Sequence, residues 1–450
     1  MGVGSCEVLK GMAFLMLVFG IISCGVDKGP LASDERETGG SAAKLVVSKG
    51  KAGGYSPQYL LPPEKAIAAY GLKTLGEIPY PPNNQHNPVR VELGQLLFFD
   101  PILSGEKDVS CGTCHHPDFG FSDGRDLSAG TGGVGLGPDR QVFSSAITGD
   151  DFHAVPRNAP TIWNTAFNQD SNGRTTHLSL QFLDGRVEGG LEEQATKPPT
   201  SRVEMAGDAY PGEVAIDSLV ARLREIPEYV ELFERAFADE GIAGAEVVNE
   251  DTYGRAVAAY ERELIGRNTA YDLFVDGDEN ALTRQQRWGM QLFHTKAKCA
   301  ACHRGAMFAD FRFVVQGVPQ IGPGKDVIPG DDTGREEATN DPADRFAFRT
   351  TTLRNIELTA PYMHDGVFAT LTEVVEFYNE GALPRHPAVS DDMLDTELKA
   401  PLGLNPSEVS ALVAFMKGLT DNGSAINPQL LRVPERVPSG LAPVLGVRAQ

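Results

Sequence analysis

Two copies of the pattern Cys-x-x-Cys-His constrain this chain more than any other feature of its sequence. The first copy spans Cys111–His115 and the second spans Cys299–His303. On a tight helical turn, the two thiols of such a pattern can each form a thioether with a haem vinyl group, and the next residue can direct its imidazole at the iron. The two copies therefore predict two covalently bound haem c groups. The attachment residues are Cys111, Cys114, Cys299 and Cys302, and the iron ligands are His115 and His303.

The sequence has no pair of cysteines left over for a structural disulfide. Cys6 and Cys24 lie near the N-terminus, and every further cysteine belongs to one of the two motifs. A zinc site would need four convergent Cys or His ligands at short range, whereas each motif already carries its own histidine in a different half of the chain. Haem attachment is therefore favoured over a zinc site or a redox dithiol.

The N-terminus has the pattern of an export signal. An apolar run from Met12 to Ile22 follows Lys10 and is too short to span a bilayer, but it suits the core of a signal peptide. It leads into Ser23-Cys24, which looks like a bacterial lipobox. We expect residues 1–24 to be a signal peptide and Cys24 to be lipidated, with simple secretion as the alternative. The protein would then lie in the periplasm or cell envelope, and only a lipid anchor would hold it to a membrane.

The length and composition allow two ordinary domains with their own cores, since the chain has 450 residues and 41% hydrophobic content. The 49 Gly and 30 Pro indicate helical units joined by long turns. With one motif per half, we expect an all-α fold of two cytochrome c-like haem domains with long loops. The predicted parts are a flexible tether and N-terminal extension (25–85), a first haem domain (86–268), a second haem domain (269–425) and a C-terminal extension (426–450). The long loops are 126–155 and 318–345.

Helix signals surround both motifs. Asn249 is expected to cap a helix ending near Arg267, and residues 271–279 are expected to cross between the halves. Thr283 with Gln286 forms a capping box before the second motif, and Asn405 precedes another helix.

The formal net charge of −21 makes nucleic acid an unlikely partner, because such binding needs a basic face. The charge most simply reflects a well-solvated surface. The alternative is that it steers a basic redox partner.

The two motifs and their neighbours resemble the bacterial di-haem cytochrome c peroxidase and MauG superfamily, in its MauG-like subgroup, over about residues 88–420. The stretches that carry the resemblance are 93–100, 121–125, 157–161, 184–186, 191–194, 203–205, 352–355 and 358–366. The resemblance implies that the first haem reacts with hydrogen peroxide and that the second haem stores or relays an electron.

The resemblance also implies site residues. Gln194 and Glu204 match the family's distal glutamine and catalytic glutamate, and Pro198 matches a residue that lines the same pocket. Cleavage of the O–O bond requires a proton to move from one oxygen to the other, which a carboxylate over an open iron can achieve. Without the resemblance, Glu204 would be read as an ordinary surface acid.

A calcium site between the haems is implied as well. Asn164, Thr359 and Pro361 match the family's calcium donors, and hard oxygen ligands suit that ion. On sequence alone Asn164 would be a turn residue.

Two departures from the family's pattern sharpen the prediction. Thr131 stands where some of these peroxidases carry a distal histidine, so the first iron is expected to be open, with His153 as a possible substitute. Tyr378 stands where the family keeps the distal ligand of the second haem, on the inner face of a helix capped by Thr370; Met363 is the alternative ligand. An anionic phenolate favours oxidised iron.

Two further departures concern tryptophan. Leu183 replaces the tryptophan usually found between the haems, and Ala297 replaces a surface tryptophan of MauG. The electron route must therefore differ. Trp163 and Trp288, the only tryptophans, could serve, although each is also an ordinary core residue.

We therefore expect a cytochrome-c peroxidase or MauG-like oxidoreductase. It would reduce hydrogen peroxide at an open first haem and form a high-valent state shared with a His/Tyr second haem. The oxidised partner would be a small cytochrome, a cupredoxin or a tryptophan-bearing protein. The alternative is a non-catalytic di-haem electron-transfer cytochrome.

Overall fold

The computed structural model describes residues 60–142, 154–321, 331–421, 423 and 426–443. The predicted signal peptide, the lipidation residue Cys24, the first part of the tether and His153 lie outside these residues. Within them, no helix combines the length and the apolar character needed to cross a membrane.

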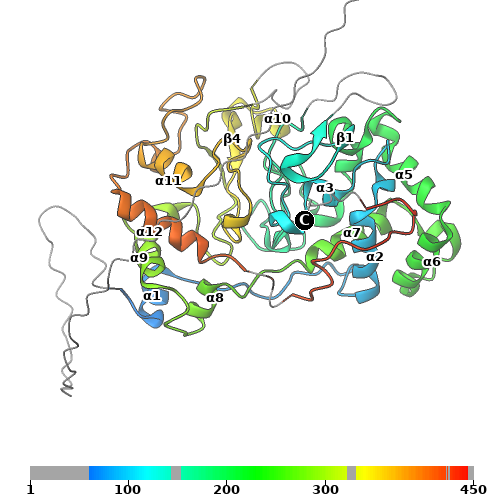
Figure 1. Cartoon of the computed structure of the whole chain (residues 1–450), viewed down its shortest axis with the longest axis horizontal. Helices are drawn as coiled ribbons and strands as arrows, with labels where there is room; N and C mark the ends of the chain where they lie inside the picture. Colours follow the sequence, from blue (N-terminus) through cyan, green and yellow to red (C-terminus); the bar gives the residue numbers. More distant parts are fainter. Residues whose placement is uncertain (1–59, 143–153, 322–330, 422, 424–425, 444–450) are drawn as a thin grey trace, which may run out of the picture. The chain divides into compact units, whose positions relative to one another are not determined.

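Helices dominate the described chain, which confirms the predicted class, and the strands form two small antiparallel pairs (Figure 1). The α-helices are α1 (Pro63–Tyr70), α2 (Pro88–Phe99), α3 (Cys111–Cys114), α4 (Gly190–Gln194), α5 (Ala215–Arg224), α6 (Pro227–Ala236), α7 (Glu250–Arg262), α8 (Ala270–Val275), α9 (Arg284–His294), α10 (Glu336–Thr339), α11 (Leu371–Asn379) and α12 (Pro406–Lys417). The strands are β1 (Gly133–Val134), β2 (Gln141–Val142), β3 (Phe313–Val315) and β4 (Ala347–Arg349).

In the first half, α2 and α7 cross at a glycine. A Cβ atom at Gly94 of α2 would lie 1.9 Å from the Ala256 carbonyl oxygen and 2.9 Å from the Cβ of Tyr260, both in α7. Only glycine permits so close an approach. Leu97 and Phe98, on the next turn of α2, are fully buried in the core that this crossing creates.

In the second half, α9 and α12 repeat this crossing. A Cβ atom at Gly289 would lie 1.9 Å from the Ala411 carbonyl oxygen and 2.8 Å from the Cβ of Phe415. Leu292 and Phe293 follow Gly289 at the spacing at which Leu97 and Phe98 follow Gly94. The two halves therefore share one geometry of helix crossing, whereas the exact domain boundaries stay predictions.

Side-chain caps begin the helices at the predicted residues. Asn249 accepts a hydrogen bond from the Thr252 amide at the start of α7. Thr283 and Gln286 form the capping box of α9, and Asn405 caps α12. These short-range hydrogen bonds satisfy amides that have no partner inside the helix.

The end of α7 differs from the prediction, because the helix stops at Arg262 rather than near Arg267. The backbone that follows pairs with Asn164 instead. The Asn164 amide donates to the Leu264 carbonyl, and the Asn164 side-chain oxygen accepts from the Gly266 amide. The segment predicted to cross between the halves starts with α8, which packs in the core of the second half.

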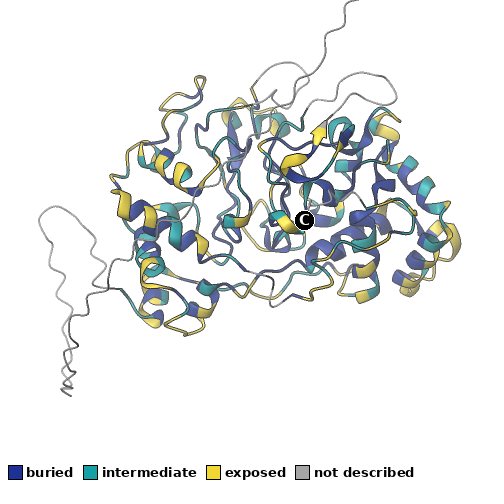
Figure 2. Ribbon diagram, viewed as in Figure 1, coloured by how far each residue is buried: buried dark blue, intermediate teal, exposed yellow. Residues whose placement is uncertain are grey.

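The first strand pair, β1 and β2, lies within the long loop 126–155, whereas β3 and β4 flank the long loop 318–345. In the second pair, Val314 of β3 faces Phe348 of β4, and β4 ends at Arg349. Buried residues continue from the helices into this loop-rich region (Figure 2). The loops therefore form part of the interior and can contribute side chains to a pocket.

Candidate functional site

The first Cys-x-x-Cys segment forms α3, a single helical turn. At its start the Ser110 amide donates to Thr113 Oγ1 at 3.0 Å as part of a capping box. At its end the His115 amide donates to the Cys111 carbonyl at 2.9 Å. Cys111, Cys114 and His115 all line one cavity.

The second motif repeats this local structure. Cys299 begins a short 3-10 turn, and the His303 amide donates to the Cys299 carbonyl at 2.9 Å. None of the four motif cysteines forms a disulfide. Burial raises the pKa of the Cys111 and Cys299 thiols to about 12, so both are neutral.

The two motif histidines are oriented in the same way. His115 Nδ1 lies 3.1 Å from the Phe121 carbonyl oxygen, and His303 Nδ1 lies 2.8 Å from the Phe308 carbonyl oxygen. A carbonyl can only accept, so Nδ1 carries the proton and Nε2 keeps the lone pair that a metal needs. Burial lowers the pKa of both imidazoles, which favours this neutral form.

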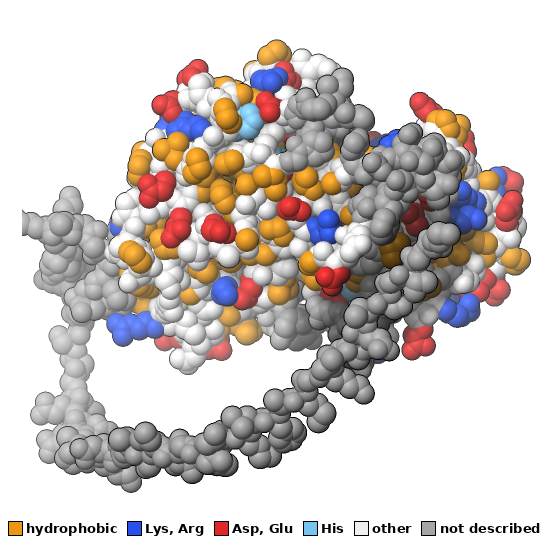
Figure 3. Space-filling model, turned by 45° about the horizontal axis from the view of Figure 1, so that its top comes forward, with side chains coloured by type: hydrophobic (Ala, Val, Ile, Leu, Met, Phe, Trp, Pro, Cys, Tyr) orange, Lys and Arg blue, Asp and Glu red, His pale blue; other side chains and the backbone are white. Residues whose placement is uncertain are grey.

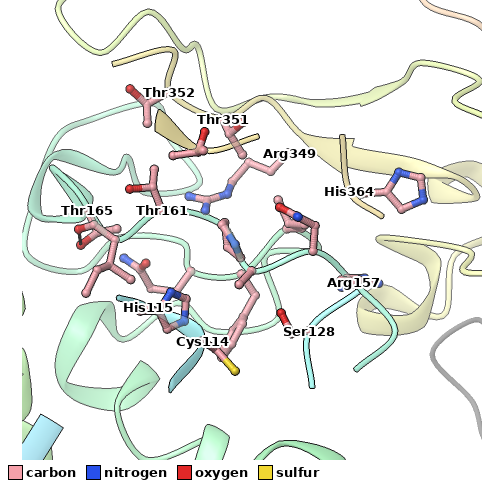
Figure 4. A pocket seen from close by; sticks show the side chains of 18 of the residues that line it. Cys114, His115, Ser128, Arg157, Thr161, Thr165, Arg349, Thr351, Thr352 and His364 are labelled. Atoms are coloured by element: carbon pink, nitrogen blue, oxygen red, sulfur yellow. Dashed lines mark hydrogen bonds between the residues drawn. The ribbon is translucent and has the colours of Figure 1, made fainter. Parts of the chain in front are cut away.

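One cavity of about 710 Å³ joins the two motifs. It is lined by Cys114 and His115 from the first half and by His303 and Tyr378 from the second. Figure 4 shows part of this cavity, with Cys114 and His115 extending into it. Oriented imidazoles and a large cavity fit a haem at each motif; the second motif contributes His303 to the lining, and the first contributes both cysteines and His115.

A bare metal ion fits less well. Among the described residues, no group of three or more His, Cys, Asp and Glu side chains could hold a metal ion. This finding gives no support to the zinc alternative. It gives no support to calcium, which stays a prediction from the resemblance.

The predicted calcium donors are only partly brought together. Thr359 and Pro361 line the cavity, whereas Asn164 does not. Asn164 is fully buried, and its side-chain oxygen already accepts the Gly266 amide at 2.9 Å.

The predicted catalytic residues lie in the same cavity as the first motif. Gln194 ends α4, Pro198 begins a short 3-10 turn, and both line the cavity. Glu204, also a lining residue, is partly buried on a π-helical turn, Arg202–Ala206. A π turn is rare and often lies at a functional site.

The loop that carries Thr131 packs against this π turn. Thr131 Oγ1 donates to the Arg202 carbonyl at 3.0 Å, so the threonine faces backbone. Arg140 holds the same loop by donating to the carbonyls of Ala129 and Gly130, both at 2.6 Å. Thr131 thus gives the loop a contact with the turn that carries Glu204.

Both candidate ligands of the second haem line the cavity. Tyr378 lies on α11, which is capped by Thr370 and Glu373 as the sequence predicts. Burial raises the pKa of the Tyr378 phenol well above its ordinary value. Met363 lies in a turn with a φ of 77°, an uncommon conformation for a residue other than glycine.

The tryptophans occupy different surroundings. Trp163 lines the cavity and packs edge-on against Phe121, with ring centroids 5.4 Å apart. Leu183 lines the same cavity, whereas Ala297 is buried in the core of the second half. Trp288 packs at the edge of that core and lines a separate small groove.

Sequence reasoning missed a buried ionic cluster between the halves. Arg157 donates to both carboxylate oxygens of Asp332, at 2.5 and 2.7 Å, and to Asp184 at 2.7 Å. Arg157 and Asp184 stood out as parts of motifs, but nothing in the sequence linked them to Asp332, which lies in a loop of the other half. The sequence also did not predict that the guanidinium of Arg349, in β4, is buried.

The amino-acid sequence is similar to a protein family and to relatives that carry descriptive names. Residues 88–280 match the model of the di-haem cytochrome c peroxidase family. A cytochrome-c peroxidase from Denitromonas iodatirespirans is 34% identical over 78% of this chain and 86% of that protein. The methylamine utilization protein MauG of Methylorubrum extorquens is 34% identical over 78% of this chain and 84% of that protein.

Solved structures give the same result. A MauG-like protein associated with microbial copper homeostasis has a TM-score of 0.64 and 28% identity, covering 81% of this chain and 98% of that one. The diheme peroxidase BthA from Burkholderia thailandensis has a TM-score of 0.57 at 22% identity, over 82% of this chain and 93% of that one, which bears on the fold alone. Together with the two motifs that share one cavity, these similarities show that the chain belongs to the di-haem cytochrome c peroxidase family, which includes MauG.

Proposed function

We propose that this protein reduces hydrogen peroxide at the haem site of its first half. One observation carries the proposal: Glu204 and Gln194 line the same cavity as Cys111, Cys114 and His115. A carboxylic acid and an amide beside a haem site supply the proton transfer and the hydrogen bond that cleavage of an O–O bond requires.

Two haem c groups, held at the two motifs, would supply the one-electron chemistry that the side chains of this cavity lack. The balanced reaction consumes one peroxide, two protons and two electrons and yields two waters. Glu204 takes the proton from one peroxide oxygen and delivers it to the other, which leaves as water. Gln194 orients the peroxide by a hydrogen bond, and Pro198 limits the access of bulk water.

We interpret each half as a cytochrome c-like haem domain, and we assign His303 and Tyr378 as the residues that would hold the second haem. That haem would supply storage for one of the two oxidising equivalents. An anionic oxygen donor favours the oxidised form of its metal, so this site would accept an oxidising equivalent more readily than a site with the Met363 thioether.

The electron donor or substrate is a small redox protein, such as a cytochrome or a cupredoxin, or a protein that exposes a tryptophan. One relative is named a cytochrome c551 peroxidase, from Pseudomonas aeruginosa, which supports a cytochrome as the partner. On the face drawn in Figure 3, acidic and basic side chains are interspersed with hydrophobic ones. We place the protein in the periplasm or cell envelope, with a lipid at Cys24.

The test is Glu204→Gln in the haem-loaded protein. We expect peroxide consumption to fall about 10²- to 10⁴-fold, the usual contribution of a positioned acid–base group, with haem content unchanged. Glu193→Gln is the matched control, because Glu193 is an exposed residue of α4 paired only with Lys197 in the next turn. Full peroxide consumption by Glu204→Gln would contradict the proposal. Failure of the wild-type protein to consume peroxide would favour a simple electron carrier.

A further inference from the structure

Arg349 is a buried cation for which the described part of the chain supplies no anionic partner. Its side chain is 9% exposed and lines the cavity that joins the two motifs. Nη1 donates to the Leu180 carbonyl at 2.8 Å, and the buried Nε has no hydrogen-bond partner. No carboxylate of the described residues lies within 4.0 Å of the guanidinium. In Figure 4 the side chain extends from its strand in the second half into the space that Cys114 and His115 enter from the first half.

The acid that attracts Arg349 is already hydrogen-bonded to other arginines. Asp184 is fully buried and attracts Arg349 electrostatically, but it accepts hydrogen bonds from Arg157 at 2.7 Å and from Arg186 at 2.8 Å. Asp332, the other buried acid of this cluster, is held by Arg157. The acids of the cluster therefore neutralise other arginines and leave Arg349 uncompensated.

Buried Arg140 also lacks a carboxylate partner, but its Nε and both Nη atoms donate to backbone carbonyls. Two further buried arginines are paired with acids. Arg354, 1% exposed, forms two hydrogen bonds of 2.8 Å with the carboxylate of Asp272. Arg262, also 1% exposed, pairs with Glu192 at 2.8 Å. Burial without such a partner lowers the pKa of Arg349 to about 10. Since an unpaired buried charge is strongly unfavourable, a ligand that enters this cavity is expected to bring the missing anion.

We infer that Arg349 binds a propionate carboxylate of one of the two haems. Each haem c carries two propionates, and a planar guanidinium binds a carboxylate through two parallel hydrogen bonds. Because Arg349 belongs to the second half and already contacts backbone of the first half, it would hold the cofactor at the junction of the halves. The inference rests on the haem content that the family implies and does not depend on peroxide chemistry.

The reduction potentials of the haem-loaded protein test this inference without peroxide. Loss of the guanidinium leaves the propionate charge uncompensated and favours oxidised iron. We expect Arg349→Gln to lower one of the two reduction potentials by at least about 59 mV. For a one-electron couple, this shift corresponds to a tenfold change in the reduction equilibrium. Arg349→Lys, which keeps the charge without the planar fork, should shift the same potential less. The haem whose potential also responds to Tyr378→Met is the one in the second half.

The control is Arg304→Gln, which removes the same charge from an exposed position beside the second motif; the Arg304 side chain is 60% exposed. Equal shifts in Arg349→Gln and Arg304→Gln, or no shift in either, would overturn the inference. If Arg349→Gln fails to mature, a crystal structure of the wild-type holoprotein decides. A propionate oxygen within about 3.2 Å of the Arg349 guanidinium supports the inference, and the absence of one within about 4 Å refutes it. Two haems with no such contact would leave the proposed peroxide chemistry intact.

Discussion

Gly130 packs so closely on Val203 that a Cβ atom at position 130 would lie 1.9 Å from the Val203 carbonyl oxygen. Such a Cβ atom would also lie 2.9 Å from the Cα atom of Glu204. Main chain surrounds it on that side, so no flexible side chain can move away to make room. The position of the Glu204 turn therefore depends on the absence of a side chain at residue 130.

We expect Gly130→Ala to lower the free energy of unfolding by about 1–3 kcal/mol, the usual cost of overpacking, and to slow peroxide consumption by displacing Glu204. Thermal unfolding and stopped-flow measurements check both effects. Gly76→Ala is the control, since nothing lies within 4 Å of a Cβ atom there. Equal behaviour of the two variants would show that the Glu204 turn does not depend on this contact.

The Arg157 cluster should make stability depend on pH. Burial alone would raise the pKa of Asp332, but the hydrogen bonds and charge of Arg157 outweigh it and hold the pKa below its ordinary value. The folded state thus releases this proton more readily than the unfolded state. The resulting stability is present above the unfolded pKa of about 3.9 and is lost as the pH falls through the folded value.

We expect Asp332→Asn to cost about 3–5 kcal/mol at pH 7, because it leaves a buried guanidinium without its main partner. The difference from wild type should shrink in denaturation measurements below about pH 4. Glu228→Gln removes an exposed partner of Arg436 and should cost about 0–1 kcal/mol. A pH-independent difference for Asp332→Asn would rule out the ionic explanation.

The ligand of the second haem can be identified from potentials. If Tyr378 is the ligand, Tyr378→Met replaces an anionic oxygen with a neutral sulfur and should raise one reduction potential. The reduction equilibrium of that haem should change by well over tenfold. Met363→Leu should then leave both potentials nearly unchanged. The reverse pattern, measured by spectroelectrochemistry, would assign Met363.

Glu261 is a buried acid of α7 that lines the cavity and is 5% exposed. Burial raises its pKa to about 8, so the folded state keeps a proton that the unfolded state loses above about pH 4. Stability should therefore fall as the pH rises from about 4 to 8. Glu261→Gln should remove most of this decline in thermal unfolding, whereas Glu246→Gln, at a side chain that is 79% exposed, should not. An unchanged pH profile for Glu261→Gln would refute this assignment.

Local signals predicted much of the scaffold. The caps at Asn249, Thr283 and Asn405 lie where the structure has them, because each cap bonds to an amide within its own first turn. Each Cys-x-x-Cys segment likewise forms a helical turn with its histidine directly after it, because the five residues of the motif determine this local conformation. The cavity position of Gln194 and Glu204 followed only from the resemblance, because no local pattern indicates a π turn.

Contacts between residues that are far apart in the chain could not be predicted from the sequence. The end of α7 depends on Asn164, which is distant in the chain and competes for the backbone after Arg262. Arg157 and Asp332 meet only because the long loop 318–345 folds back onto the first half, and a loop of this length carries no periodic pattern that reveals its partners. A buried arginine such as Arg349 looks like an ordinary surface charge until the surroundings of its strand are known.

The glycines at 94 and 289 leave both halves with helices in direct main-chain contact. Glu204 and Tyr378, the side chains that most distinguish the two ends of the cavity, both lie on other elements. Either side chain can therefore be exchanged without a change at the helix crossing of its half. Chemical specialisation in this molecule requires no change in the scaffold that supports it.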